Sequence, residues 1–344
     1  MNRQIRVVQY GVGPIGAAIV RLMLDKPGLI VTGAVDIDQE KVGKDLGLLA
    51  GAKRRLNVLV THDIRTALNS RPDVVVHSTS SLLRDVSDQL QECLQASTHV
   101  LSTCEELAYP FRKHPDLSEQ LDRCAREHNA VLLGTGVNPG FAMDKLVLTI
   151  ATACHRVTKV KVRRVVDASR RRLPLQKKVG AGFTLEEFRA RVGQGVIKHH
   201  GLPESVAMIA DSLGLPADSI EESIEPVIAS ETVRAGNLEI PRGRVLGIHQ
   251  VAHGVSQGTE SICLELEMYV GAPEPVDAIT IEGLPDLKLA IPGGIHGDYA
   301  TVAIAVNCIP ALLEARPGLR ISRDIPMSYL SGSTCWENSN APAA

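Results

Sequence analysis

Aromatic side chains are scarce in this chain of 344 residues: they make up 3% of it, with a single tryptophan. Stacking of nucleic-acid bases, which relies on such rings, is therefore not expected to be its main activity. No excess of one charge exists either, with 37 basic residues against 39 acidic ones. Because that balance gives no basic footprint, we expect no nucleic-acid partner and no binding to anionic membranes.

Long hydrophobic runs and paired cysteines are also missing. No window holds eighteen apolar residues, and the start, MNRQIRVVQYG, leads directly into a strand-like pattern. We therefore expect neither a membrane span nor a signal peptide. The seven cysteines are scattered and never form a CxxC pair. This usage is typical of reduced thiols, so the sequence predicts a cytoplasmic protein without a metal site.

Strand-like and helix-like segments alternate through the first part of the chain. The apolar, β-branched runs lie at residues 5–10, 29–35, 56–60, 73–77, 99–102 and 130–133, and the helical patterns at 14–24, 63–70, 82–95 and 117–128. Strands that alternate with helices in this way require right-handed crossovers between parallel strands. The pattern predicts an α/β domain with a doubly wound parallel sheet.

The pattern changes near Gly134. Alternating or extended segments lie at 157–167, 222–235, 244–253, 260–270 and 278–281, with helical patterns at 184–192 and 204–212. They predict a second α+β domain built on a mostly antiparallel sheet. We expect residues 1–140 to form the first domain and 141–297 the second, for substrate and dimerisation. Residues 298–344 should pack back on the first domain through a helix at 299–313, and the tail 331–344 should be loosely ordered.

The turn after the first strand is a glycine fingerprint. Gly11, Val12, Gly13, Pro14, Ile15 and Gly16 spell GVGPIG, which fits GxGxxG between a strand and a helix. The glycines allow a tight turn, an approach of pyrophosphate to the backbone, and close contact of helix and sheet. The phosphate would rest on the helix amino terminus. The pattern indicates a Rossmann domain that binds NAD(H) or NADP(H).

An acidic residue follows the second strand at the expected distance. Asp36 lies 20 residues after Gly16 and can accept hydrogen bonds from the adenosine ribose, which favours NAD. Asp38 adds negative charge against a 2′-phosphate. Lys41 lies close enough to oppose that effect, so NADP stays open.

Polar clusters follow two further strands. His77, Ser78 and Thr79 are candidate cofactor contacts, although His77 fits a core role equally well and Ser80 or Ser81 would cap the next helix. Another cluster, Ser102, Thr103 and Cys104, follows the strand at 99–102. We expect Cys104 to be a buried or cofactor-adjacent thiol rather than a nucleophile.

Two adjacent carboxylates, Glu105 and Glu106, complete the second cluster. A carboxylate at a hydride-transfer site has the wrong sign to stabilise an alkoxide and the right sign to hold an iminium or ammonium. The pair therefore indicates amine chemistry. Both glutamates also fit the start of a short helical turn, where the helix dipole favours acids.

The junction between the domains has an unusual backbone. The segment GTGVNPGF, residues 134–141, demands turns at its glycines and at Asn138-Pro139. Gly136 and Asn138 are candidate contacts of the nicotinamide carboxamide, and a hinge is the alternative. Candidate substrate-pocket residues are Phe141, Met143 and His296, although His296 fits a structural role equally well. The basic stretch 163–178 would bind a substrate carboxylate or cofactor phosphates, or face solvent, and 176–182 would close over the cleft.

Together these segments resemble a known family. The motifs that carry the resemblance are GVGPIG, VDIDQEKVGKDLG, STCEELAYP, GTGVNPGFAMD, RRLPLQKKVGAG and HGDYATVAIAVNCIP. They are similar to those of the dihydrodipicolinate-reductase-like oxidoreductases, and within these to 2,4-diaminopentanoate dehydrogenases and native NAD(P)-dependent amine dehydrogenases. The resemblance implies a two-domain homodimer with a nicotinamide cofactor. It also implies a catalytic glutamate in the STCEEL motif. Homoserine dehydrogenases carry a lysine at what looks like the same strand-end position, and by analogy the catalytic residue is Glu105, with Glu106 as the fallback.

The implied activity is the oxidative deamination of a primary amine to a ketone or aldehyde plus ammonia, and the reverse reductive amination. The small-molecule partners are then an amine, or a ketone with ammonia. Alternatives are 2,4-diaminopentanoate dehydrogenase activity proper, reduction of an imine or aldehyde, and a dinucleotide sensor without catalysis.

Overall fold

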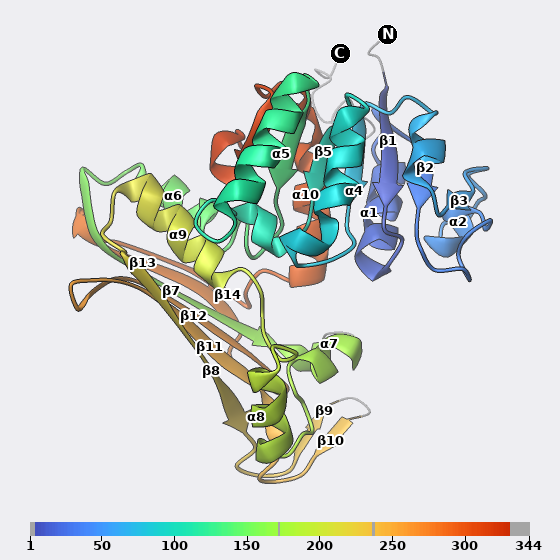
Figure 1. Ribbon diagram of the computed structural model, residues 1–344. Helices are drawn as coiled ribbons and strands as arrows, with labels where there is room; N and C mark the ends of the chain where they lie inside the picture. Colours follow the sequence, from blue (N-terminus) through green and yellow to red (C-terminus); the bar gives the residue numbers. More distant parts are fainter. Residues whose placement is uncertain (1–3, 171–172, 236–237, 331–344) are drawn as a thin grey trace, which may run out of the picture. The chain divides into compact units, whose positions relative to one another are not determined.

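The computed structural model describes residues 4–170, 173–235 and 238–330 (Figure 1). The chain divides into two compact units, one of residues 1–140 with 297–344 and one of residues 141–296. Arg171 and Arg172 of the basic stretch, and the tail 331–344, lie outside the described residues. Within the described part, no helix is long and apolar enough to cross a membrane.

The first unit is built on a seven-stranded sheet in the order β15-β6-β5-β4-β1-β2-β3. Its strands are β1 (Ile5–Tyr10), β2 (Leu29–Val35), β3 (Val60–Thr61), β4 (Val74–His77), β5 (His99–Ser102), β6 (Val131–Gly134) and β15 (Gly318–Ile321). All neighbouring strands run parallel. The predicted doubly wound parallel sheet is confirmed.

Helices cover both faces of this sheet. They are α1 (Pro14–Leu24), α2 (Leu46–Leu49), α3 (Ile64–Leu68), α4 (Leu83–Gln95), α5 (Pro115–Glu127) and α10 (Gly297–Leu313), with short 3-10 turns η1 (Glu105–Ala108) and η3 (Ser322–Asp324). Val7 packs in the layer of α1 and α10, whereas its neighbour Val8 packs in the layer of α3, α4 and α5. Because both faces are buried, the strands read as unbroken apolar runs rather than alternating ones.

One predicted strand of the first unit needs correction, and one observed strand is new. The strand expected at 56–60 is confined to β3, because Asp45 takes the N–H groups of Leu56 and Asn57 (3.2 and 2.8 Å) in place of a neighbouring strand. The strand β15 was not predicted. It follows α10 and pairs with β6, so the carboxyl-terminal segment adds a strand as well as a helix.

The second unit is a six-stranded sheet in the order β14-β13-β7-β12-β11-β8, beside a small hairpin of β9 and β10. The strands are β7 (Arg156–Asp167), β8 (Ser219–Ile228), β9 (Val233–Ala235), β10 (Leu238–Ile240), β11 (Val245–Ser256), β12 (Thr259–Tyr269), β13 (Val276–Leu284) and β14 (Leu287–Pro292). Among the described strands of this sheet, only β7 and β12 pair in parallel. The predicted, mostly antiparallel sheet is confirmed.

Four helices and a short turn accompany this sheet. They are α6 (Lys145–Ala151), α7 (Leu173–Lys178), α8 (Leu185–Gly193), α9 (Leu202–Leu213) and the 3-10 turn η2 (Ala168–Arg170). Helix α9 packs on β8, β11 and β12. The sequence did not predict α6, α7 or β14. Since α7 extends to Lys178, the segment 176–182, which we expected to be a flexible closing loop, begins in a helix.

Candidate dinucleotide and amine site

The glycine loop has the geometry that a dinucleotide requires. Gly11 has φ +87°, and a Cβ on it would lie 2.4 Å from the Ser78 carbonyl oxygen. A Cβ on Gly16 would lie 1.9 Å from the Gly11 carbonyl oxygen. A Cβ on Gly13, in contrast, would meet no protein atom within 4 Å. Gly11 and Gly16 are therefore needed by the protein itself, whereas Gly13 leaves open space at the loop.

Helix α1 begins at this open space without a side-chain cap. Its N-cap is Gly13, and its first turn holds no acidic residue. The unpaired N–H groups and the positive end of the helix dipole therefore remain available to an anion. With Gly13 open, the residues present fit a pyrophosphate.

Asp36 is buried and fixed by the glycine loop. Its Oδ2 accepts the Val12 N–H (2.8 Å), and its Oδ1 accepts the Asp38 N–H (2.9 Å). Lys41 Nζ lies 3.1 Å from Asp36 and 3.4 Å from Asp38. Burial alone would raise the pKa of Asp36, but the two backbone N–H groups and Lys41 outweigh it and hold the pKa below its ordinary value. Asp36 is thus an ionised acceptor with an ammonium beside it.

His77 lies inside the sheet edge, fully buried. Its Nδ1 is 2.9 Å from Ser102 Oγ, and its Nε2 is 2.8 Å from Gln89 Oε1 and 2.9 Å from Thr79 Oγ1. Burial lowers the pKa of His77 to about 4, so the ring is neutral at neutral pH. Ser102 is also fully buried. Neither side chain offers accessible surface to a cofactor, so the structure favours the core alternative for His77 and a positioning role for Ser102.

Ser78, Thr79 and Thr103 keep accessible surface at the same edge. Ser78 Oγ lies 2.9 Å from Nε2 of Gln9, a residue that the sequence reading missed. Gln9 is fully buried and donates to the Gly11 carbonyl oxygen (3.0 Å), which supports the glycine loop from below. Gln9 could have been identified from the sequence, because it is a polar residue inside the otherwise apolar end of the strand at 5–10.

Cys104 is buried, as expected, with 1% of its surface exposed. Its thiol lies 3.3 Å from the Ser81 carbonyl oxygen, to which it donates. Burial raises the pKa of Cys104 to about 12. The thiol therefore stays protonated at neutral pH, which removes the nucleophilic alternative.

The two glutamates differ in their surroundings. Glu105 and Glu106 both belong to η1, which follows β5, but Glu105 is partly exposed whereas Glu106 is 4% exposed. Glu106 Oε2 accepts the Leu83 N–H (2.8 Å) and lies 3.0 Å from His114 Nε2, while Oε1 lies 2.6 Å from Lys113 Nζ. Burial alone would raise the pKa of Glu106, but Lys113, the Leu83 N–H and His114 outweigh it and lower the pKa. Glu106 is an ionised carboxylate bonded to protein groups on both oxygens.

The cap of α4 differs from the expected one. We expected Ser80 or Ser81 to cap this helix, but its N-cap is Leu82, which has no capping side chain. The Ser80 hydroxyl accepts the N–H of Leu82 (3.3 Å), which precedes the first helical residue, Leu83. Glu106, more than twenty residues away in sequence, accepts the first helical N–H instead.

The loop 134–141 holds a side chain whose polar atoms lack protein partners. Asn138 is buried, and neither its Oδ1 nor its Nδ2 has a hydrogen-bond partner among the described residues. Gly136 is buried beside it. A buried amide without partners is costly unless a ligand or water bonds to it. This observation fits the prediction that Asn138 meets the nicotinamide carboxamide.

The three predicted substrate-pocket residues belong to the second unit. Phe141 is partly exposed, Met143 is fully buried and His296 is exposed. The backbone next to His296 is held firmly, because the Ile295 N–H donates to Asp277 (2.6 Å) and its carbonyl oxygen accepts from Arg164 (2.7 Å). Their role at a substrate pocket stays a prediction.

The basic stretch contains two arginines with structural partners. Arg164 and Asp277 form a buried ion pair at 2.5 Å. Arg163 lies 2.6 Å from Glu267 on the neighbouring strand. Because their partners already neutralise these two charges, neither arginine is a good candidate to bind a substrate carboxylate.

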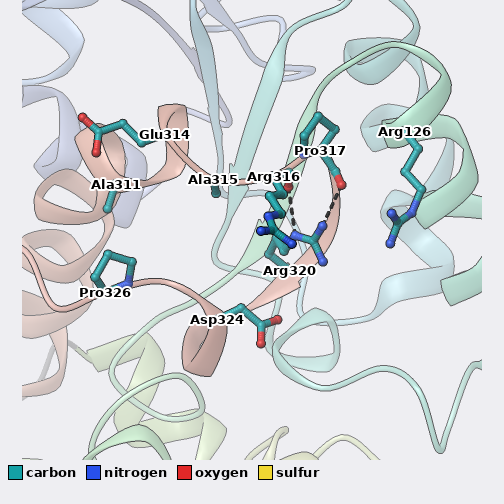
Figure 2. Close-up of a pocket in the computed structure, with 9 residues that line it drawn as sticks. All are labelled: Arg126, Ala311, Glu314, Ala315, Arg316, Pro317, Arg320, Asp324 and Pro326. Carbon is teal, nitrogen blue, oxygen red and sulfur yellow. Dashed lines mark hydrogen bonds between the residues drawn. The ribbon is translucent and has the colours of Figure 1, made fainter.

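A hollow of about 990 Å³ lies beside the edge strand β15 (Figure 2). Three strands, β6, β5 and β4, separate β15 from β1 in the sheet order. Arg320 lines the hollow and donates to the carbonyl oxygens of Arg316 (2.9 Å) and Pro317 (2.7 Å), as Figure 2 shows. Ligands of open parallel sheets bind at the carboxyl ends of the strands, near the topological switch point, so we place the site at the glycine loop instead.

One group of side chains has metal-ligand chemistry. Ligand atoms of His253, Glu260 and Cys263 lie within 4.8 Å of one another on β11 and β12. Glu260 is also paired with Lys159 at 2.7 Å, so a bound cation would face an ammonium. The charge arrangement disfavours a metal there.

The parallel sheet, the open glycine loop and the buried aspartate define a dinucleotide-binding protein of the Rossmann type. Residues 141–335 match the family described as 2,4-diaminopentanoate dehydrogenase C-terminal domain, and residues 5–103 match dihydrodipicolinate reductase, N-terminus. The chain belongs to the 2,4-diaminopentanoate dehydrogenase and amine dehydrogenase family, and it is an NAD(P)-dependent dehydrogenase that acts on amino groups.

Three relatives cover nearly the whole chain. A 2,4-diaminopentanoate dehydrogenase of Acetoanaerobium sticklandii is 30% identical, over 94% of this chain and 94% of its own. An amine dehydrogenase of Streptomyces virginiae is 25% identical, over 94% and 96%. The structure of an amine dehydrogenase from Mycobacterium smegmatis superposes with a TM-score of 0.82 at 28% identity, over 95% of this chain and 98% of its own. The resemblance seen in the motifs is confirmed.

Proposed function

We propose that this protein catalyses the NAD(P)-dependent oxidative deamination of a primary amine and the reverse reductive amination, with Glu105 as its catalytic base. The observation that carries the proposal is the difference between the adjacent carboxylates. Protein groups occupy both oxygens of Glu106, whereas Glu105 keeps accessible surface at the end of β5. Strand ends are where ligands of such sheets bind.

A carboxylate at this place suits each proton step of the reaction. An amine loses hydride only as the neutral base, so Glu105 takes a proton from the substrate ammonium and releases it to solvent, which restores the carboxylate before the hydride leaves. As positive charge grows on the substrate nitrogen, the same carboxylate stabilises the iminium. The Glu105 carboxylate then removes a proton from the water that adds to the iminium carbon, and gives that proton to the amino nitrogen of the carbinolamine. It accepts the hydroxyl proton as the carbonyl forms and ammonia departs. A bound nicotinamide supplies the hydride acceptor, or the donor in the reverse direction.

The residues of the first unit fit this cofactor. Gly11 to Gly16 and the α1 amino terminus would hold the pyrophosphate, Asp36 the adenosine ribose, and Asn138 the carboxamide. Ser78, Thr79 and Thr103 would line the same edge. In the substrate pocket we propose Phe141 as part of the apolar wall and His296 as a polar contact. Met143 is fully buried and would only support that wall from the protein interior.

We propose that both cofactors are accepted, because Lys41 neutralises part of the acidic pair that would repel a 2′-phosphate. Replacing Lys41 with alanine leaves Asp36 and Asp38 uncompensated. The kcat/KM for NADPH should then fall about 10-fold, since like charges brought together cost binding energy, while that for NADH changes little. Steady-state kinetics with both cofactors measures this. Equal losses with NADH and NADPH would contradict the role of Lys41.

The function itself is tested by cofactor oxidation across a panel of ketones and aldehydes, with and without ammonium. We expect oxidation of NADH or NADPH that requires both the carbonyl compound and ammonium. Cofactor oxidation that needs no ammonium would indicate an aldehyde reductase. Cofactor oxidation only when a cyclic imine is added would indicate an imine reductase. A dinucleotide sensor would oxidise neither cofactor. Including 2,4-diaminopentanoate in the reverse assay tests the narrower family activity.

We further propose that the enzyme acts as a homodimer in the cytoplasm. All six described cysteines are free thiols, which suits a reducing compartment. Light scattering on the purified protein measures the oligomeric state, and a monomer at working concentration would contradict the proposal.

A further inference from the structure

We propose that Glu106 is a positioning residue that, together with Lys113 and His114, fixes the turn carrying Glu105. This inference rests on the proposed function, because it concerns how Glu105 is held. It assigns a role to two residues, Lys113 and His114, that no motif singled out.

The turn is tied to α4 through main chain and side chain. The Glu106 N–H donates to the Ser81 carbonyl oxygen (3.2 Å), which also accepts the Cys104 thiol (3.3 Å). The Glu106 carboxylate accepts the Leu83 N–H at the start of α4 (2.8 Å). The residues on both sides of Glu105 are therefore bonded to the segment 81–83.

The Glu106 carboxylate also contacts Lys113 and His114, in the segment that follows the turn. Since a carboxylate only accepts, the buried His114 must carry its proton on Nε2 to donate across the 3.0 Å contact. Lys113 lies 2.6 Å from the second oxygen and neutralises the buried charge. One carboxylate thus joins three segments, namely the turn η1, the start of α4 and residues 113–114.

The turn η1 also packs closely against the end of strand β6. A Cβ on Gly134, at the end of β6, would lie 2.3 Å from the Leu107 carbonyl oxygen, so the strand contacts the turn directly. Hydrogen bonds hold Cys104 and Glu106, the two neighbours of Glu105, and β6 packs against the turn. The backbone of Glu105 therefore has little freedom. Positioning of this kind matters, because a displacement of about 1 Å at a reacting group costs up to roughly 100-fold in rate.

The test compares kcat, KM and cofactor affinity in four variants with the wild type. Glu106→Gln loses one acceptor oxygen and the charge, and His114→Ala loses the donor. We expect both to lower kcat by roughly 10- to 100-fold, with the KM of the amine and the dissociation constant of NADH within about 2-fold. His114→Gln keeps an N–H donor near the Nε2 position and should restore kcat to within about 3-fold. A role in stability alone would lower the melting temperature and leave kcat unchanged below it.

Glu105→Gln, measured in parallel, separates this inference from the proposed function. Wild-type kcat in Glu106→Gln and His114→Ala, with Glu105→Gln inactive, overturns the inference and leaves the proposed function standing. An active Glu105→Gln overturns the proposed base and the inference with it. If Glu106→Gln does not fold, the comparison of His114→Ala with His114→Gln decides the question, because equal kcat in these two variants overturns the inference.

Discussion

Replacing Glu105 with glutamine is expected to lower kcat for amine oxidation by about 100- to 10,000-fold, the range that positioned acid–base groups supply. Glutamine keeps the size and an acceptor oxygen, but it cannot take the ammonium proton or carry the charge that stabilises an iminium. NADH affinity should stay within about 2-fold, because the glycine loop and Asp36 do not depend on Glu105. Steady-state turnover and titration with NADH measure the two quantities.

The control for this variant is Glu119→Gln, which removes an exposed carboxylate from α5. It makes the same chemical change at a distance from the strand end and should leave kcat unchanged. Retention of most amine turnover in Glu105→Gln would show that another group removes the proton. If Glu106→Gln were then the inactive variant, the two roles would have to be exchanged.

Replacing Gly13 with alanine is the second prediction with a large effect. A Cβ there meets no protein atom within 4 Å, and the backbone, at φ −74°, suits alanine, so the melting temperature should not change. The methyl group would instead occupy the space into which the pyrophosphate fits. We expect NADH to bind 10- to 100-fold more weakly, a loss of about 1.4 to 2.8 kcal/mol. Calorimetric titration and thermal unfolding test the two statements separately.

Gly28→Ala is the matched control, because a Cβ on Gly28 also meets nothing within 4 Å but lies outside the glycine loop. Its NADH affinity should equal that of the wild type. Gly16→Ala offers the opposite contrast, since its Cβ would lie 1.9 Å from the Gly11 carbonyl oxygen and should destabilise the fold itself. Unchanged NADH affinity in Gly13→Ala would contradict the placement of the cofactor.

Local patterns were enough to predict the frame of the molecule. The strand at Ile5–Tyr10, the helix that ends at Leu24 and the strand at Leu29–Val35 have the boundaries that the sequence indicated. Each is set by neighbouring residues: buried β-branched runs, a Pro at the helix start, and glycine turns. The strand β15 escaped prediction because its sequence, GLRI, begins with a glycine and contains an arginine, so it lacks the apolar, β-branched run that marks the equally short β4.

The division of roles between the glutamates could not be predicted, because it depends on contacts far apart in sequence. Nothing in STCEEL shows that Glu106 accepts the N–H of Leu83 or meets His114. The same holds for His77, which as a residue at a strand end looks like a cofactor contact. Its burial follows from packing against Gln89 and Ser102, which come from two other elements.

The most direct test of the account is the identity of the product formed from a ketone, NADH or NADPH, and isotopically labelled ammonium. Mass spectrometry of the wild-type reaction should show a primary amine that carries the labelled nitrogen, in equal amount to the cofactor oxidised, and Glu105→Gln should form almost none. An alcohol without the label, formed at the same rate with or without ammonium, would contradict the account.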